Sequence, residues 1–212
     1  MFLLVTGPRG AGKTSFCREL LTRLGHLPDQ EVPFGALAFL SDRLSPAGAR
    51  EAGYDLTVLS YRSERVRKNA FRWIKTDMRS LPLLRSRDAL PEGEGPSVGP
   101  WRFSESTFAE AIALFEREAP RLRSGDLLVI DEIGPLELRL QEGFAPLLER
   151  VSLLPRVVVV VRPSLVANLK TRLAGGPDGD TRTMILDLRP GAHREPESYR
   201  TILEHSAGFI TG

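Results

Sequence analysis

A glycine-rich turn at residues 7–14, GPRGAGKT, constrains the fold more than any other stretch of the chain. It follows a short apolar run, residues 2–5, and leads into a segment with helical spacing. Its three glycines allow backbone conformations that a Cβ would forbid, so successive N–H groups can converge on an anion. The N-terminus of the following helix adds further N–H groups and the positive end of its dipole. The segment therefore predicts a strand, a phosphate-binding loop and a helix.

The pattern GxxxxGK followed by Thr is the Walker A motif of nucleotide-binding proteins. Lys13 is expected to act on the β- and γ-phosphates, and the Thr14 hydroxyl is the expected Mg²⁺ ligand. The alternative, an ordinary glycine-rich turn, is disfavoured because the motif and its strand and helix context agree. The predicted nucleotide-binding residues are Gly7, Pro8, Arg9, Gly10, Ala11, Gly12, Lys13, Thr14 and Ser15.

A second chemical landmark lies further along the chain, where four apolar residues, 127–130, run into Asp131 and Glu132. Continuous apolar runs are typical of parallel strands that are covered on both faces. Ligands bind at the carboxyl edge of such sheets, and two carboxylates there are costly unless a metal or ligand occupies them. We therefore predict that Asp131 is a metal ligand, as the Walker B acid. Glu132 is the predicted catalytic residue that orients and deprotonates water, with Lys13 as its catalytic partner.

Another fully apolar strand, RVVVVV at 156–161, ends in Arg162. We expect this cation at the same sheet edge as the phosphates. Two roles remain open for it: Arg162 could sense or stabilise the γ-phosphate, or it could pair with a core carboxylate.

Strands alternate with helices along the chain, which predicts an α/β fold with a mostly parallel central sheet in a single P-loop NTPase domain over residues 1–212. Cys17 is expected in the core, because it lies on the apolar face of the first helix. A helix is expected over 101–122 with a Thr107–Glu110 capping box, and the Gly- and Pro-rich segment 84–100 is expected to be a loop. Further strands are expected at 35–42, 53–61 and 183–188, the last of them buried.

Bulk properties limit the class of protein. The 212 residues suit one domain, and a net charge of +2 does not by itself support a nucleic-acid partner. The arginine-rich stretch 62–75 leaves such a partner open, although a solvated face that leads into a short strand is favoured. The first residues lack a signal-peptide pattern and no apolar run approaches about 18 residues, so we expect a cytoplasmic protein without a membrane span. Protein partners cannot be inferred from the sequence.

The stretch VIDEIGPLEL at 129–138 resembles the Walker B strand of the THEP-like nucleoside triphosphatases. Its spacing from GPRGAGKT, and VGPWRFSESTF before the intervening helix, are also similar to that family. The resemblance implies a RecA-like three-layer fold and Mg²⁺-dependent hydrolysis of ATP, GTP and other nucleoside triphosphates to diphosphates. It reinforces the Walker residues and adds Glu137 as a candidate site residue. The chain departs from the family at 161–163, where Val-Arg-Pro replaces a Thr-Val-His-like strand end.

Two other functions remain open from the sequence. A P-loop kinase could transfer the γ-phosphate to a small molecule or nucleic-acid end, with arginines at 62–72 and 85–87 clamping the acceptor. A nucleotide-dependent switch or adaptor is the other, because Asp131 to Gly134 fits the Asp-x-x-Gly of regulatory GTPases. An Asn-Lys-x-Asp guanine-reading motif is absent from the sequence, which argues against a guanine switch.

Overall fold

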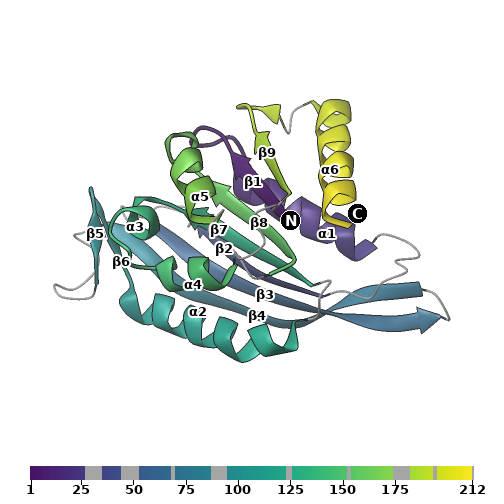
Figure 1. Cartoon of the computed structure of the whole chain (residues 1–212), viewed down its shortest axis with the longest axis horizontal. Coiled ribbons are helices and arrows are strands. Elements are labelled where there is room, and N and C mark those ends of the chain that lie inside the picture. Colours follow the sequence, from purple (N-terminus) through teal and green to yellow (C-terminus); the bar gives the residue numbers. More distant parts are fainter. Residues whose placement is uncertain are drawn as a thin grey trace, which may run out of the picture.

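The computed structural model describes residues 1–26, 35–43, 53–67, 70–86, 95–122, 126–151, 154–173, 182–192 and 195–211. Within these ranges, nine strands form one sheet in the order β5-β6-β4-β3-β2-β7-β8-β1-β9, with helices on both faces (Figure 1). The strands are β1 Phe2–Thr6, β2 Ala36–Arg43, β3 Gly53–Arg67, β4 Ala70–Ser86, β5 Ser97–Val98, β6 Trp101–Phe103, β7 Leu127–Ile133, β8 Arg156–Val161 and β9 Thr183–Asp187. The helices are α1 Lys13–His26, α2 Glu105–Glu118, α3 Pro135–Leu138, α4 Ala145–Val151, α5 Val166–Leu173 and α6 Pro196–Thr211, with 3-10 turns η1 Ala119–Arg121 and η2 Pro163–Leu165.

The sheet is mixed, which corrects the prediction of a mostly parallel one. Strands β2, β7, β8, β1 and β9 pair in parallel. The pairs β2–β3, β3–β4, β4–β6 and β5–β6 are all antiparallel. Antiparallel neighbours can be joined by a tight turn, whereas parallel ones need a crossover. The prediction failed because β3, β4, β5 and β6 add antiparallel strands to one side of the parallel core.

Two apolar layers hold the helices to the sheet. Alternate residues of β1 face opposite layers: Phe2 and Leu4 pack with α2, α4 and α5, whereas Leu3 and Val5 pack with α1 and α6. All four side chains are fully buried, as the continuous apolar run predicted for a strand covered on both faces. Cys17 is fully buried in the α1 layer, which confirms its predicted place in the core.

The predicted helix over 101–122 was wrong at its start. Residues 101–103 form β6, which pairs with Ser86, Arg85 and Leu84 of β4. The N-cap of α2 is Ser104, whose side chain accepts a hydrogen bond of 3.2 Å from the backbone N–H of Thr107. Pairing with β4 therefore displaced the cap by three residues from the predicted Thr107.

The other predicted elements fare differently. The strands at 35–42 and 53–61 are confirmed as β2 and β3, and β3 continues to Arg67. Residues 183–187 form β9, but its side chains alternate between exposed and half-buried, because β9 lies at the edge of the sheet. The predicted loop 84–100 is partly strand, and residues 87–94 lie outside the described part of the chain. Among the described helices, none is long and apolar enough to cross a membrane.

Candidate functional site

The glycine-rich turn connects β1 to α1 at the carboxyl edge of the parallel strands. Gly7, Gly10 and Gly12 have φ angles of 142°, 80° and 84°, a region that side-chain-bearing residues rarely adopt. A Cβ on Gly7 would lie 2.4 Å from the backbone oxygen of Leu188. Glycine is therefore required at position 7 both by backbone conformation and by the close approach of the segment after β9.

Lys13, the first residue of α1, folds back over the turn. Its Nζ donates hydrogen bonds of 3.0 Å to the backbone oxygens of both Gly7 and Pro8. The ammonium group therefore lies over the turn itself, where the motif predicts that it meets phosphate.

Thr14 joins the two predicted motifs. Its hydroxyl donates a 2.5 Å hydrogen bond to Oδ2 of Asp131, 117 residues further along the chain. Asp131 belongs to β7, which is separated from β1 by β8 alone in the sheet order. The fold thus brings together two residues that sequence reasoning assigned to one metal.

Asp131 is 2% exposed. Burial raises its pKa to about 7, and the charge of Glu132 adds to this, while the hydrogen bond from Thr14 lowers it. A buried carboxylate with a raised pKa at the ligand-binding edge of a sheet is typical of a functional site.

The oxygens of Thr14 and Asp131 fit the way in which Mg²⁺ is usually held. That ion prefers hard oxygen donors, and it commonly takes one or two protein ligands, with waters and substrate phosphates completing the octahedron. Within the described ranges, there is no cluster of three or more His, Cys, Asp or Glu residues that could hold a metal ion by itself. The donor set therefore suits a metal that arrives with a phosphate.

Glu132 and Arg162 form an ion pair at the same edge. The Nε of Arg162 donates a 2.8 Å hydrogen bond to Oε1 of Glu132. Glu132 lies near the end of β7 and Arg162 directly follows the neighbouring strand β8, and the two strands pair at Ile133 and Val161. The side chains are 30% and 59% exposed, respectively. Arg162 thus contacts a partly exposed carboxylate, where the sequence had suggested a core one, and its action on a γ-phosphate stays a prediction.

Glu137 is buried in α3, with 3% of its surface exposed. Its two carboxylate oxygens accept hydrogen bonds from the backbone N–H groups of Gly134 (2.8 Å) and Phe144 (3.4 Å). Burial raises its pKa. A Cβ on Gly143 would lie 2.6 Å from the same carboxylate. Its contacts are therefore those of a residue that fixes the loop after β7.

A polar network beside Asp131 was not predicted from the sequence. Asp42, near the end of β2, pairs with Arg18 of α1 and accepts a hydrogen bond from Thr57 of β3. The preceding residue, Ser41, donates to the backbone oxygen of Asp131. The signal was available: a strand that ends in Ser-Asp places polar groups at the edge where parallel strands bind ligands.

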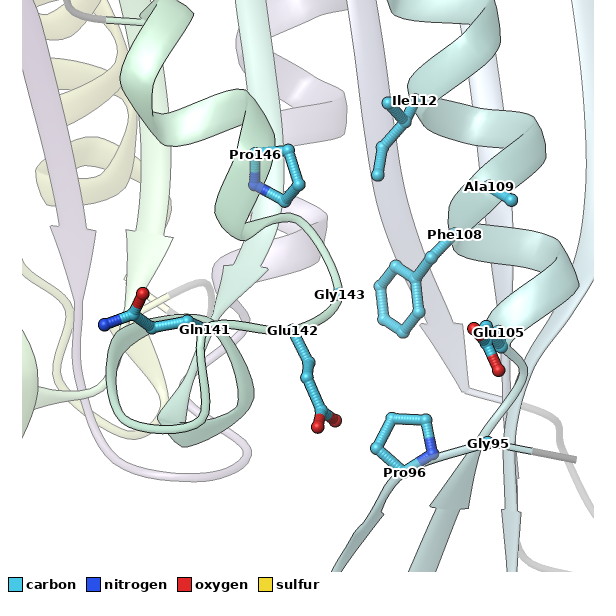
Figure 2. A pocket seen from close by; sticks show the side chains of 10 residues that line it. All are labelled: Gly95, Pro96, Glu105, Phe108, Ala109, Ile112, Gln141, Glu142, Gly143 and Pro146. Atoms are coloured by element: carbon cyan, nitrogen blue, oxygen red, sulfur yellow. The ribbon is translucent and has the colours of Figure 1, made fainter. Parts of the chain in front are cut away.

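A shallow cleft of about 570 Å³ opens on the α2 face of the sheet (Figure 2). Phe108 of α2 faces the segment 141–146 across it, and the carboxylates of Glu105 and Glu142 lie on its two sides. Gly143 belongs both to this cleft and to the loop fixed by Glu137. The cleft therefore shares a wall with the segment that follows Asp131 and Glu132.

The described arginines that suggested a phosphate-acceptor clamp either lie at the other edge of the sheet or are already engaged, and Arg87 lies outside the described residues. Ala36, the first residue of β2, pairs with Tyr61, so Arg62 and the residues after it lie beyond the amino edge of the parallel strands. The phosphate loop is at the opposite, carboxyl edge. Arg85 is bonded to the Asp55 carboxylate at 2.6 Å and to two backbone oxygens.

Comparison with known proteins gives one informative result. The structure matches "Crystal Structure of THEP1 from the hyperthermophile Aquifex aeolicus", with a TM-score of 0.59 and 22% sequence identity over 99% of each chain. This chain has the fold of THEP1. The predicted resemblance to the THEP-like P-loop proteins is therefore confirmed at the level of the fold. No protein-family profile and no curated protein matches the chain.

Proposed function

We propose that the chain is a Mg²⁺-dependent nucleoside triphosphatase, which hydrolyses ATP, GTP and related triphosphates to diphosphate and phosphate. The observation that carries the proposal is the hydrogen bond between Thr14 and Asp131. It joins the end of the phosphate loop to a buried carboxylate, and a metal-bound triphosphate requires these two groups side by side.

Phosphate binding falls to the turn and to Lys13. The positive φ angles at positions 7, 10 and 12 let backbone N–H groups converge, and α1 begins directly after them. Lys13 exchanges its two backbone oxygen partners for the more strongly charged β- and γ-phosphate oxygens. Thr14 and Asp131 would hold Mg²⁺, which would supply positive charge to neutralise the phosphates.

Glu132 holds and deprotonates the water for in-line attack, because it is the partly exposed carboxylate next to the buried metal ligand. Arg162 orients that carboxylate through the 2.8 Å hydrogen bond. Its side chain is 59% exposed, so it has room to turn toward an arriving γ-phosphate. Glu137 supports the site by fixing the loop that follows the Walker B strand.

Hydrolysis is favoured over transfer to an acceptor. A kinase needs cations near the γ-phosphate that hold the acceptor, whereas Arg62 lies beyond the opposite edge of the sheet and Arg85 is engaged by Asp55. Base specificity is expected to be broad, because the groups assigned here all act on phosphate, metal or water.

The test is phosphate release from a panel of ribo- and deoxynucleoside triphosphates, with Mg²⁺ or with a chelator. We expect phosphate release from triphosphates with several different bases. This release should depend on Mg²⁺ and should be lost in Asp131→Asn. A matched control is Asp187→Asn, at the end of the edge strand β9, which should leave release unchanged. Transfer of the γ-phosphate to added acceptors in place of water, or no metal-dependent release from any nucleotide, would overturn the proposal.

A further inference from the structure

The hairpin formed by β3 and β4 extends past the rest of the sheet. Pairing between β2 and β3 begins at Ala36 and Tyr61, but β3 and β4 remain paired as far as Arg67 and Ala70. The ribbon projects from the body at this end of the molecule (Figure 1). Six residues of β3 beyond Tyr61 correspond to a projection of about 20 Å. We call residues 62–75 the arm, of which the structure describes residues 62–67 and 70–75.

Positive charge is concentrated on the arm. Its 14 residues include six Arg or Lys and one Glu, a formal charge of +5, whereas the whole chain carries +2. The remaining residues together therefore carry −3. The nearly neutral total conceals a strongly basic projection on an acidic body, and such separation creates a local field that attracts polyanions.

The described side chains of the arm leave its charges facing water. Arg62 is 64% exposed and reaches Glu118 only at 3.9 Å, and Lys75 is exposed. Tyr61 and Lys75 are paired directly across the ribbon, so Arg62, the residue after Tyr61, belongs to the opposite face from Lys75. Positive charge is therefore available on both faces of the ribbon.

The aromatic residues at the base of the arm are already occupied. The ring of Trp73 lies 5.2 Å from that of Tyr61, and it packs so closely on α1 that a Cβ at Gly25 would lie 3.3 Å from it. These rings fix the ribbon to the body, so they are not free to stack on unpaired bases or to form the apolar centre of a protein interface. Recognition by the described cations of the arm therefore depends on charge and shape.

We propose that the arm binds the phosphate backbone of duplex DNA. A two-stranded antiparallel ribbon fits the major groove, which is about 12 Å wide. A ribbon in that groove faces a phosphate chain on each side, and it carries a cation for each face in Arg62 and Lys75. Contacts of this kind carry no sequence information, so we expect binding to be independent of sequence and strongly dependent on salt.

The test measures fluorescence anisotropy of the full chain with a labelled duplex of about 20 base pairs, two helical turns, across a salt series. If the arm neutralises about four phosphates, the slope of log K against log salt should be about −3.6. Arg62→Ala/Lys75→Ala should reduce the steepness by about 2 units. At about 0.1 M salt, the affinity of this double variant for the duplex should fall on the order of 10-fold for each cation removed. Adding Arg65→Ala and Arg72→Ala should reduce the salt dependence further.

The matched control is Lys170→Ala/Arg200→Ala, which removes the same charge from exposed positions of α5 and α6. It should bind duplex like the unmodified chain, and all variants should retain the same circular dichroism and melting temperature. Equal loss of binding in the control, or unchanged binding in the arm variants, would overturn the proposal. So would tighter binding of the single strand, or equal binding of polyglutamate, which would indicate an acidic protein partner. Phosphate release without DNA should be the same in arm and control variants, so this test stands apart from that of hydrolysis.

Discussion

Replacement of Glu132 by Gln isolates the proposed chemistry from the fold. The amide has the shape of the carboxylate, and its oxygen can still accept the 2.8 Å hydrogen bond from Arg162. What is lost is a charge that is 30% exposed and paired with a guanidinium that is 59% exposed. Such exposed pairs contribute about 0.2–1 kcal/mol to stability. The melting temperature should therefore move by only a few degrees.

The effect on catalysis should be much larger. An amide cannot take a proton from water, and loss of a general base typically costs about 10²- to 10⁴-fold in rate. Nucleotide affinity should be unchanged, because Lys13 and Thr14 remain. The assay combines steady-state phosphate release with equilibrium titration of a fluorescent nucleotide. Glu142→Gln, in the cleft of Figure 2, is the control for loss of one exposed carboxylate. Phosphate release by Glu132→Gln at the rate of the unmodified chain would refute the role of Glu132 as the base.

The remaining predictions concern the residues around this chemistry. Lys13→Ala should weaken nucleotide binding by about 10- to 100-fold, the worth of a charge-assisted hydrogen bond; wild-type affinity by titration calorimetry would contradict the phosphate-loop assignment. Arg162→Ala should lower the hydrolysis rate on the order of 10-fold with little change in melting temperature, because it orients Glu132; a loss confined to stability would count against it. Gly7→Ala should destabilise the fold by more than about 1–3 kcal/mol in urea unfolding, from strain at φ 142° plus the contact with Leu188; a neutral result would mean that the turn adapts. Glu137→Ala should cost about 2–6 kcal/mol, because two buried N–H groups lose their acceptor, whereas a purely catalytic role would leave the unfolding curve unchanged.

The parallel half of the fold follows from local sequence signals, and the antiparallel half does not. The runs at 2–5, 127–130 and 157–161 are apolar at every position. This is because each of these strands is covered on both faces. Residues 62–75 carry a different signal, since charged residues interrupt the apolar ones throughout. Where a strand projects into water, its partner strand supplies the hydrogen bonds for its backbone groups. The side chains then need not be apolar, so their pattern does not indicate which strand is the partner. The sequence therefore indicated a solvated face leading into a short strand at this stretch, and it did not predict that the strand pairs with β3 in a long hairpin.

The residues of the candidate site also differ in whether the sequence alone predicts them. Positions whose chemistry is fixed by residue type were predictable: the glycines of the turn, Lys13 and Thr14. Asp131 was predictable only because the turn had been found first, since an apolar run followed by two acids is common. The roles of Ser41 and Asp42 depend on which strand lies beside β7, and the chain order does not give that, because β2 and β7 are separated by more than 80 residues.

This neighbour relation has a consequence for how the two ends of the molecule communicate. Strand β3 begins beside Asp42 at the carboxyl edge, where Tyr54 pairs with Arg43, and it continues without interruption into the arm. Asp42 bonds both to Thr57 of β3 and to Arg18, one helical turn after Thr14. A change in the position of α1 when phosphate binds would therefore pull on the strand that carries the arm. Rigid packed elements transmit such shifts only if they have two discrete arrangements. Thr57→Val removes the hydrogen bond to Asp42 while keeping the shape of the side chain. Hydrolysis measured without DNA, and duplex binding measured without nucleotide, should both be unchanged in this variant. If the ends are coupled, nucleotide changes duplex affinity in the unmodified chain and not in Thr57→Val; an identical nucleotide effect in both would exclude this route.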